Sequence, residues 1–180
     1  MDKLIPVVVI KDVNETEKTL SALRAGGINC AEITFRTTCA EEAIKLAVKL
    51  FPDMNIGAGT VINEEQAIRA INAGAKFIVS PGLSEKVALY VRKQGVPYYP
   101  GCVTPTEIMQ ALKLGITTVK FFPANVYGGL KALKALSGPF PQVKFIPTGG
   151  VDLSNLKEFL EFDKIFAVGG SFMVKGDITE

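Results

Sequence analysis

The sequence predicts an α/β fold, a (β/α)8 TIM barrel in one domain over residues 1–180, with the N-terminal helix and the last C-terminal helix lacking or truncated. Short runs of β-branched and aromatic residues alternate with longer helical patterns. Their starts recur roughly every 20–26 residues, the length of one strand–helix unit. No G-x-G-x-x-G motif follows the first run, where an open dinucleotide-binding sheet would often carry one. A closed barrel is therefore favoured over an open doubly wound sheet.

Eight segments have the composition of buried strands. They are residues 5–10, 30–35, 56–60, 77–81, 98–102, 118–123, 144–149 and 165–169.

Helix start and stop signals lie between these strands. Asn14 is expected to cap a helix that runs to Ala25, and the segment 38–41 resembles a capping box for the next helix. Similar openings occur at Asn63, Ser84, Thr104 and residues 152–154, and glycines 74, 95 and 115 are expected to end three helices. Only seven helices follow the eight strands, whereas a complete barrel normally adds a closing helix.

Composition limits the possible functions. Hydrophobic residues make up 48% of the chain, charged residues 21%, and the net charge is +2 without a dense charged run, so neither nucleic acid nor a membrane is expected as a partner. No apolar stretch reaches the roughly 18 residues that span a bilayer. The start of the chain lacks the pattern of a signal peptide, and Cys30, Cys39 and Cys102 have no C-x-x-C spacing. We therefore expect a cytoplasmic protein with reduced cysteines.

The chain contains no histidine. Serine–histidine and cysteine–histidine nucleophile systems are excluded, and a catalytic zinc site is disfavoured because such sites usually use imidazole ligands. We expect neither a metal nor a cofactor. Proton transfer then depends on Glu, Asp, Lys, Tyr, Cys or water.

Lys120 is the strongest candidate for chemistry. It lies between Val119 and Phe121 on the sixth strand, and because side chains alternate along a strand, Lys120 should face the barrel interior. Desolvation there favours the neutral amine, which is a nucleophile. A structural lysine paired with a buried carboxylate explains the position equally well.

Glu32 has a similar place on the second strand. The even positions from residue 30 to residue 36 are Cys, Glu, Thr and Arg, and this polar face should point inward. The second and sixth strands lie opposite each other in an eight-stranded barrel, so Glu32 can act as general acid and base beside Lys120. The alternative is a structural ion pair with Arg36 or Lys120.

Further candidates lie at the ends of the strands, where barrel active sites form. The Arg36 guanidinium suits a substrate carboxylate, and Thr60 offers a hydroxyl at the same rim. Each residue alone is explained equally by a surface or capping role. Pro81 should shape the pocket wall or simply reverse the chain, and Phe122 by default belongs to the core.

Two glycine turns follow the seventh and eighth strands. They comprise Thr148, Gly149 and Gly150, and then Gly169, Gly170 and Ser171. Barrels often bind phosphate through the backbone N–H groups of these two loops. Each turn alone is routine, but the two together predict a phosphate site.

Five motifs occur in order: AEITFRT at 31–37, GAGTV at 57–61, VSPG at 79–82, VKFFPA at 119–124 and PTGGV at 147–151. Together with GGS at 169–171 they closely resemble the 2-keto-3-deoxy-6-phosphogluconate (KDPG) aldolase / 4-hydroxy-2-oxoglutarate (KHG) aldolase family. The resemblance covers nearly the whole chain. It departs in the missing terminal helices and in Asn125, where members often have glutamate.

The resemblance implies a trimeric class I aldolase of carbohydrate metabolism that acts on a small, phosphorylated 2-keto acid. It implies that Lys120 forms the Schiff base and that Glu32 is the general acid and base. It further implies that Arg36 and Thr60 bind the pyruvate carboxylate, that Gly149, Gly150 and Ser171 bind phosphate, and that Thr148 influences stereochemistry.

Other functions stay open on the same barrel. The substrate could be 4-hydroxy-2-oxoglutarate or the galactonate epimer of KDPG, and the barrel could be a non-catalytic phosphate-binding remnant. A phosphate-ester isomerase or decarboxylase is a further alternative, and the decarboxylase is disfavoured because Lys120 is not part of an Asp-x-Lys-x-x-Asp array.

Overall fold

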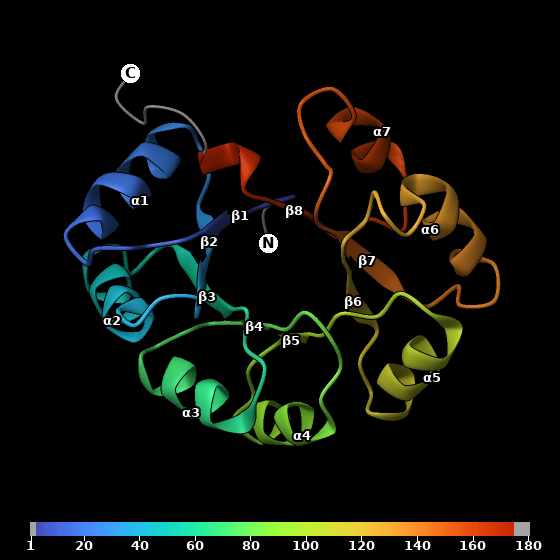
Figure 1. The fold of residues 1–180 in the computed structure, drawn as a ribbon, viewed down its shortest axis with the longest axis horizontal. Coiled ribbons are helices and arrows are strands. Elements are labelled where there is room, and N and C mark those ends of the chain that lie inside the picture. Colours follow the sequence, from blue (N-terminus) through green and yellow to red (C-terminus); the bar gives the residue numbers. More distant parts are fainter. Residues whose placement is uncertain (1–2, 175–180) are drawn as a thin grey trace.

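Eight parallel strands form a closed ring in the computed structural model, which describes residues 3–174. Six strands pair in the order β5-β4-β3-β2-β1-β8, and β6 pairs with β7. Isolated bridges from Gly101 to Lys120 and from Thr148 to Gly169 join the two sheets into the ring seen in Figure 1. The barrel predicted from the sequence is therefore confirmed.

The strands lie close to their expected positions, and most are shorter. They are β1 (Leu4–Val8), β2 (Cys30–Thr34), β3 (Asn55–Gly59), β4 (Ile78–Val79), β5 (Tyr98–Tyr99), β6 (Thr118–Phe121), β7 (Lys144–Pro147) and β8 (Val168–Gly170).

Helices follow the first seven strands and surround the ring. They are α1 (Glu15–Ala25), α2 (Ala40–Leu50), α3 (Glu64–Asn72), α4 (Glu85–Lys93), α5 (Pro105–Lys113), α6 (Gly129–Ser137) and α7 (Leu156–Glu161). A short 3-10 helix, η1 (Phe172–Val174), follows β8, and an eighth α-helix would lie outside the described residues. Within residues 3–174, none of the helices is long and apolar enough to cross a membrane.

Three of the predicted helix caps are confirmed. The side chains of Asn63, Ser84 and Thr104 accept hydrogen bonds from the backbone of the first turn, and Thr104 forms a full capping box with Glu107. Gly74, Gly95 and Gly115 have positive φ angles just after α3, α4 and α5, as expected for glycine at helix ends.

The other predicted caps are wrong. Asn14 makes no side-chain cap; its own N–H instead donates to Asp12 Oδ1 at 3.0 Å. The segment 38–41 forms no capping box, because α2 already begins at Ala40 and its first turn includes Glu41. Asp152 binds the backbone N–H of Ser154 ahead of α7, so it closes a local turn instead of capping that helix.

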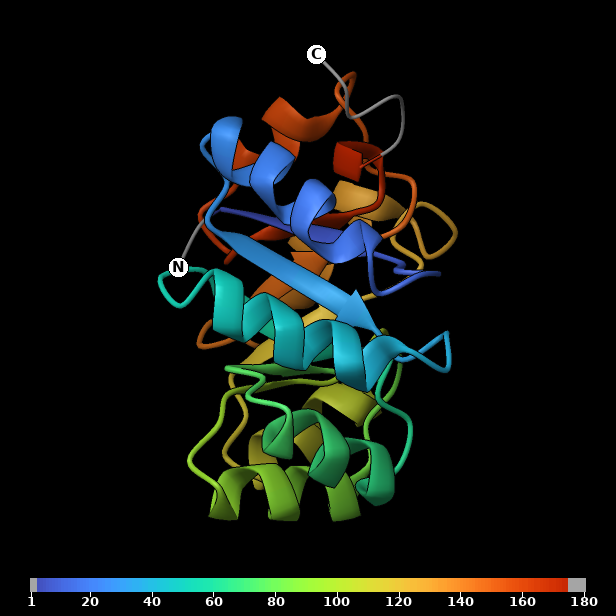
Figure 2. The ribbon, with the colours of Figure 1, turned by 90° about the vertical axis from the view of Figure 1, so that its left-hand side faces the viewer.

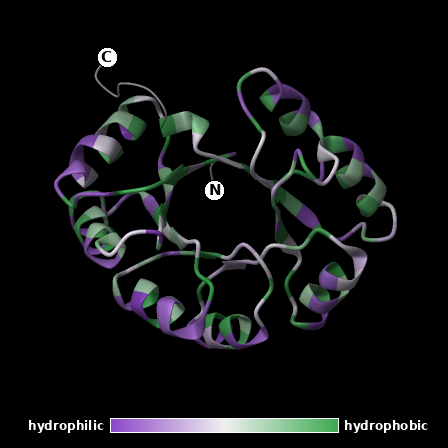
Figure 3. Cartoon of the chain, viewed as in Figure 1, coloured by the Kyte–Doolittle hydropathy of each residue, from purple (hydrophilic) through white to green (hydrophobic). Residues whose placement is uncertain are grey.

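The core has two layers. Residues on alternate positions of β2, such as Ala31 and Ile33, pack outward against the helices, while Cys30 belongs to a separate cluster inside the ring. Figure 2 shows β2 running obliquely between α1 and α2, and in Figure 3 hydrophilic residues colour much of the outer face of the helices. The interior cluster consists of Ile5, Cys30, Phe77, Val79, Tyr99, Ile146 and Ala167.

Candidate active site

Lys120 faces the interior of the barrel. Its neighbours Val119 and Phe121 are fully buried in the layer between strands and helices, and the alternation along β6 turns Lys120 to the opposite side. Only 4% of the residue is exposed. The orientation predicted from the sequence is therefore confirmed.

Glu32 meets Lys120 across the ring. Its Oε1 atom lies 3.8 Å from Lys120 Nζ, and only 2% of Glu32 is exposed. The distance is too long for a hydrogen bond, and Glu32 Oε1 has no hydrogen-bond partner among the described residues. Burying a carboxylate oxygen without a hydrogen-bond partner costs free energy, and a donor that enters the site would relieve this cost. Glu32 Oε1 is therefore free to accept a hydrogen bond or a proton from a bound molecule.

A glycine makes room for this carboxylate. Gly59 lies at the end of β3, next to β2, and a Cβ built on Gly59 would overlap the carboxylate of Glu32. A side chain at this position would displace Glu32. The second glycine of the GAGTV motif therefore has a steric role that the sequence alone did not reveal.

Phe122 also lies close to the amine. Lys120 Nζ is 5.3 Å from the centroid of the Phe122 ring, within the range of a cation–π contact. The same ring contacts the position where a Cβ of Gly149 would lie. Phe122 thus links the lysine to the glycine turn after β7. The default expectation that this aromatic residue belongs to the core is wrong, because Phe122 is only partly buried.

Arg36 and Thr60 form a pair at the rim. Arg36 Nε donates to Thr60 Oγ1 at 3.0 Å, and the two residues follow β2 and β3. Because parallel strands end at the same edge, these neighbouring loops place a guanidinium and a hydroxyl side by side. The pair has the hydrogen-bonding groups that a carboxylate requires.

A cavity of about 300 Å³ adjoins this rim at the carboxyl ends of the strands. Seven of the residues singled out in the sequence line it: Arg36, Phe122, Thr148, Gly149, Gly150, Gly170 and Ser171. The positive φ angles of Gly149 (87°) and Gly150 (75°) shape its floor, a conformation that glycine adopts at no steric cost. The two glycine turns expected to bind phosphate therefore meet in one cavity.

Five singled-out residues are not among those lining the cavity: Lys120, Glu32, Thr60, Pro81 and Gly169. Thr60 contacts the lining residue Arg36 through their hydrogen bond. The Pro81 carbonyl lies against Gly101, and the absence of a side chain at Gly169 leaves room for the Thr148 hydroxyl. The sequence reasoning missed Val7, Val151, Asp152 and Phe172, which do line the cavity. Val7 could have been found because it has the same parity along β1 as the inward-facing Ile5. Asp152 could have been found because it lies two residues after the glycine turn that ends β7.

A larger cavity of about 500 Å³ lies elsewhere, near the C-terminal ends of α4 and α5. It opens beside the starts of β5 and β6, and Arg92 is the charged residue in its lining. Barrel enzymes carry their chemistry at the carboxyl ends of the strands, so we place the site at the smaller cavity.

Comparison with known proteins gives the family. The family model for KDPG and KHG aldolase matches residues 1–180. The chain belongs to this family. The resemblance seen in the sequence motifs is confirmed, as is the expectation of an aldolase.

Individual KDPG and KHG aldolases are similar over almost the whole chain. The 2-dehydro-3-deoxy-phosphogluconate aldolase of Treponema pallidum is 45% identical over 172 residues, which cover 96% of this chain and 82% of the relative. The KHG/KDPG aldolase of Escherichia coli is 40% identical over 177 residues, covering 98% of this chain and 83% of the relative.

Solved structures of family members share the fold. The KDPG aldolase of Legionella pneumophila, with pyruvate captured as a covalent carbinolamine, superposes with a TM-score of 0.93 at 43% identity, covering 96% of this chain and 84% of that one. The Zymomonas mobilis enzyme with 3-phosphoglycerate gives a TM-score of 0.90 at 42% identity, covering 94% and 81%. The family thus includes members that hold covalent pyruvate or a phosphorylated acid.

Proposed function

We propose that this aldolase cleaves 2-dehydro-3-deoxy-6-phosphogluconate to pyruvate and glyceraldehyde 3-phosphate through a Schiff base on Lys120. The observation that carries the proposal is the 3.8 Å approach of Lys120 Nζ to Glu32 Oε1 inside the barrel. An amine nucleophile and a carboxylate base then share one enclosed space. The names of the relatives from Treponema pallidum and Escherichia coli support the substrate class.

The first step is attack of the Lys120 amine on the C2 ketone. Loss of water from the carbinolamine gives an iminium, which withdraws electrons from the C3–C4 bond. Arg36 and Thr60 hold the carboxylate at C1, which fixes the ketone over the amine. The covalent carbinolamine described for the Legionella pneumophila enzyme supports this step.

Bond cleavage follows. Glu32, directly or through water, takes the proton of the C4 hydroxyl, and the C3–C4 electron pair moves toward the iminium nitrogen to give an enamine. Glyceraldehyde 3-phosphate leaves, and protonation of the enamine at C3 and hydrolysis release pyruvate and free Lys120. The backbone N–H groups of Gly149 and Gly150, together with Ser171, bind the phosphate.

The space between the two ends of the substrate is lined by Phe122, Thr148 and Gly170, and Gly169 leaves room for the Thr148 hydroxyl. Thr148 is 7% exposed and lines the cavity next to Gly149 and Gly150. This position supports its proposed part in stereochemical control. We also propose that the protein is cytoplasmic and forms a homotrimer; light scattering of the purified protein tests the trimer.

Borohydride reduction in the presence of pyruvate tests the proposal. We expect a mass increase on the peptide that contains Lys120 and none in Lys120→Ala. Steady-state kinetics on KDPG, its galactonate epimer and 4-hydroxy-2-oxoglutarate then rank the substrates, and a chelator should leave the rates unchanged. A folded protein that shows neither the adduct nor cleavage is a non-catalytic binding barrel.

A further inference from the structure

We propose that Arg69, on the outer helix α3, is a positioning residue for the keto-acid carboxylate. It acts through the loop that carries Arg36. The inference rests on the proposed function, because it assigns a role in the binding of that carboxylate. Four contacts of the described residues carry it.

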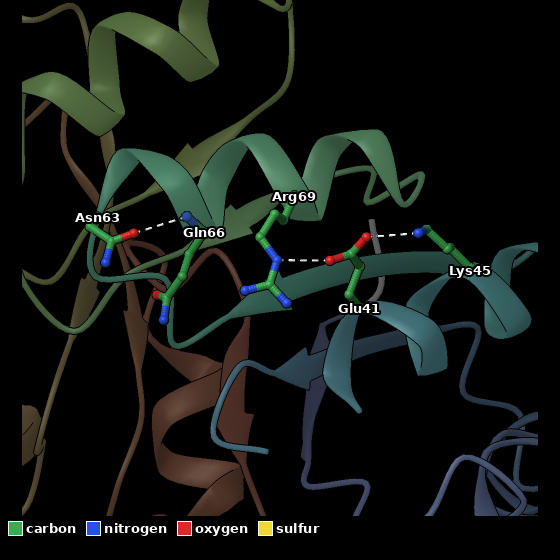
Figure 4. Close-up of polar contacts among 5 residues, drawn as sticks. All are labelled: Glu41, Lys45, Asn63, Gln66 and Arg69. Carbon is green, nitrogen blue, oxygen red and sulfur yellow. Dashed lines mark hydrogen bonds and ion pairs between the residues drawn. The ribbon is translucent and has the colours of Figure 1, made fainter. Parts of the chain in front are cut away.

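The first contact is an ion pair between two helices. Arg69 Nε lies 2.7 Å from Glu41 Oε2, and Lys45 Nζ lies 2.7 Å from the other oxygen of the same carboxylate. Figure 4 shows Glu41 at the start of α2, between Lys45 and Arg69. Hydrogen bonds from Lys45 and Arg69 lower the pKa of Glu41, so the carboxylate stays ionised at neutral pH. The pair joins the first turn of α2 to the last turn of α3.

The second contact reaches the loop before α2. The Arg69 guanidinium carbon lies 5.6 Å from the centroid of the Phe35 ring, in a cation–π arrangement. Glu41 fixes the guanidinium from one side, so the planar group is held over the ring instead of moving freely in solvent. Phe35 is the residue directly before Arg36.

The third contact fixes the other side of Arg36. The Thr37 hydroxyl donates to the Ile10 carbonyl at 2.7 Å, and the Phe35 amide donates to the Gly59 carbonyl. Both neighbours of Arg36 are therefore anchored. Arg36 itself is exposed, so its direction depends on these anchors.

The fourth contact concerns Thr60. Two residues beyond it, the Ile62 amide donates to Gln66 Oε1 at 2.9 Å, and Asn63 Oδ1 accepts from the Gln66 amide at 2.9 Å. The first turn of α3 thus holds the loop that carries Thr60, while Arg69, one turn later, holds Phe35. A single helix therefore sets the position of both halves of the Arg36–Thr60 pair. A preorganised pair binds its ligand more tightly because less order has to be imposed on binding.

The pyruvate concentration that half-saturates borohydride trapping on Lys120 is the test. In Arg69→Ala we expect this concentration to rise roughly three- to tenfold, with the maximal yield of adduct unchanged. A rise of this size is typical when a substituted residue is energetically coupled to a residue that binds the ligand, here Arg36. In Arg69→Lys the rise should be smaller, because the ammonium keeps the ion pair but not the planar stack. KM for the cleavage substrate should rise in parallel while kcat changes less than twofold.

Lys45→Ala is the matched control. It removes the other cation from the same Glu41 carboxylate but leaves the guanidinium over Phe35, so half-saturation should stay within twofold of the wild type. In an Arg36→Lys background, Arg69→Ala should have little further effect, because its influence passes through Arg36. Thermal unfolding of each variant reports any loss of folded protein.

Each other outcome overturns the inference. An unchanged half-saturation in Arg69→Ala, even with a lower Tm, assigns Arg69 a structural role only and leaves the proposed function intact. An equal rise in Lys45→Ala attributes the effect to general surface charge. A wild type that forms no adduct at all removes both the proposed function and the carboxylate site.

Discussion

Lys120 Nζ and Glu32 Oε1 lie 3.8 Å apart although β6 and β2 are on different sheets of the ring. Both side chains are at most 5% exposed, so solvent does little to screen their interaction. Because the pair is buried, removing one partner would cost much of the folding free energy. Burial also holds the Lys120 amine where it can attack a bound carbonyl group.

Glu32→Gln should separate Schiff-base formation from bond cleavage. We expect cleavage to fall by about 10²–10⁴-fold, the usual contribution of a general base. Borohydride should still trap pyruvate on Lys120, and exchange of the pyruvate methyl protons with deuterium, followed by NMR, should fall with cleavage. The exposed Glu85→Gln on α4 serves as the control. Wild-type cleavage by Glu32→Gln would remove the carboxylate from the mechanism.

Lys120→Met should destabilise the fold. It leaves the buried Glu32 carboxylate without its cation, and breaking a buried pair in this way costs about 3–5 kcal/mol. The double variant with Glu32→Gln should recover most of that loss, since no unpaired charge is left. Urea denaturation of both variants measures the difference, and equal stabilities for the two would contradict the prediction.

Gly59→Ala should reduce activity through Glu32. The added methyl group would overlap the Glu32 carboxylate, so the carboxylate has to move away from Lys120. We expect a loss of turnover of tenfold or more, corresponding to about 1.4 kcal/mol. Gly26→Ala after α1 meets a carbonyl at 3.4 Å, an ordinary contact, and should keep full activity. Equal rates in the two variants would show that the carboxylate has room to shift.

The capping side chains should differ in their effect on stability. Thr104→Ala removes the two hydrogen bonds of the Thr104 hydroxyl with Glu107, one accepted from the Glu107 amide and one donated to its carboxylate, and should cost about 1 kcal/mol. Asn14→Ala removes no cap from α1, and its effect should stay within about 0.5 kcal/mol. Chemical denaturation of the two variants gives the comparison, and a larger loss for Asn14→Ala would reverse the assignment of the caps.

The cysteines should differ in reactivity. Burial raises the pKa of the Cys102 thiol to about 12, from a usual value of 9.0. The folded protein therefore retains this proton where the unfolded chain loses it, and stability should decline as the pH rises from about 9 toward 12. At pH 8, mass spectrometry should find iodoacetamide first on the half-buried Cys39, and rapid labelling of native Cys102 would contradict its burial.

Local patterns in the sequence were sufficient for the ring of strands and for the direction of Lys120. Strand periodicity of two residues assigns Val119 and Phe121 to one face and Lys120 to the other, and this assignment depends on no other part of the chain. The caps at Asn63, Ser84 and Thr104 also follow from short-range chemistry. The cap expected at Asn14 failed because the side-chain amide of Asn14 donates to Asp12 Oδ1 instead. The capping box expected at residues 38–41 failed because α2 begins before its expected first residue.

Contacts between distant segments were decided only by the tertiary structure. The clearance that Gly59 provides for Glu32, the packing of Phe122 between Lys120 and Gly149, and the bridge from Glu41 through Arg69 to Phe35 each join separate strand–helix units. Periodicity fixes which face a side chain occupies but not its distance from a residue on another strand. That distance depends on closure of the ring, which the whole chain forms together.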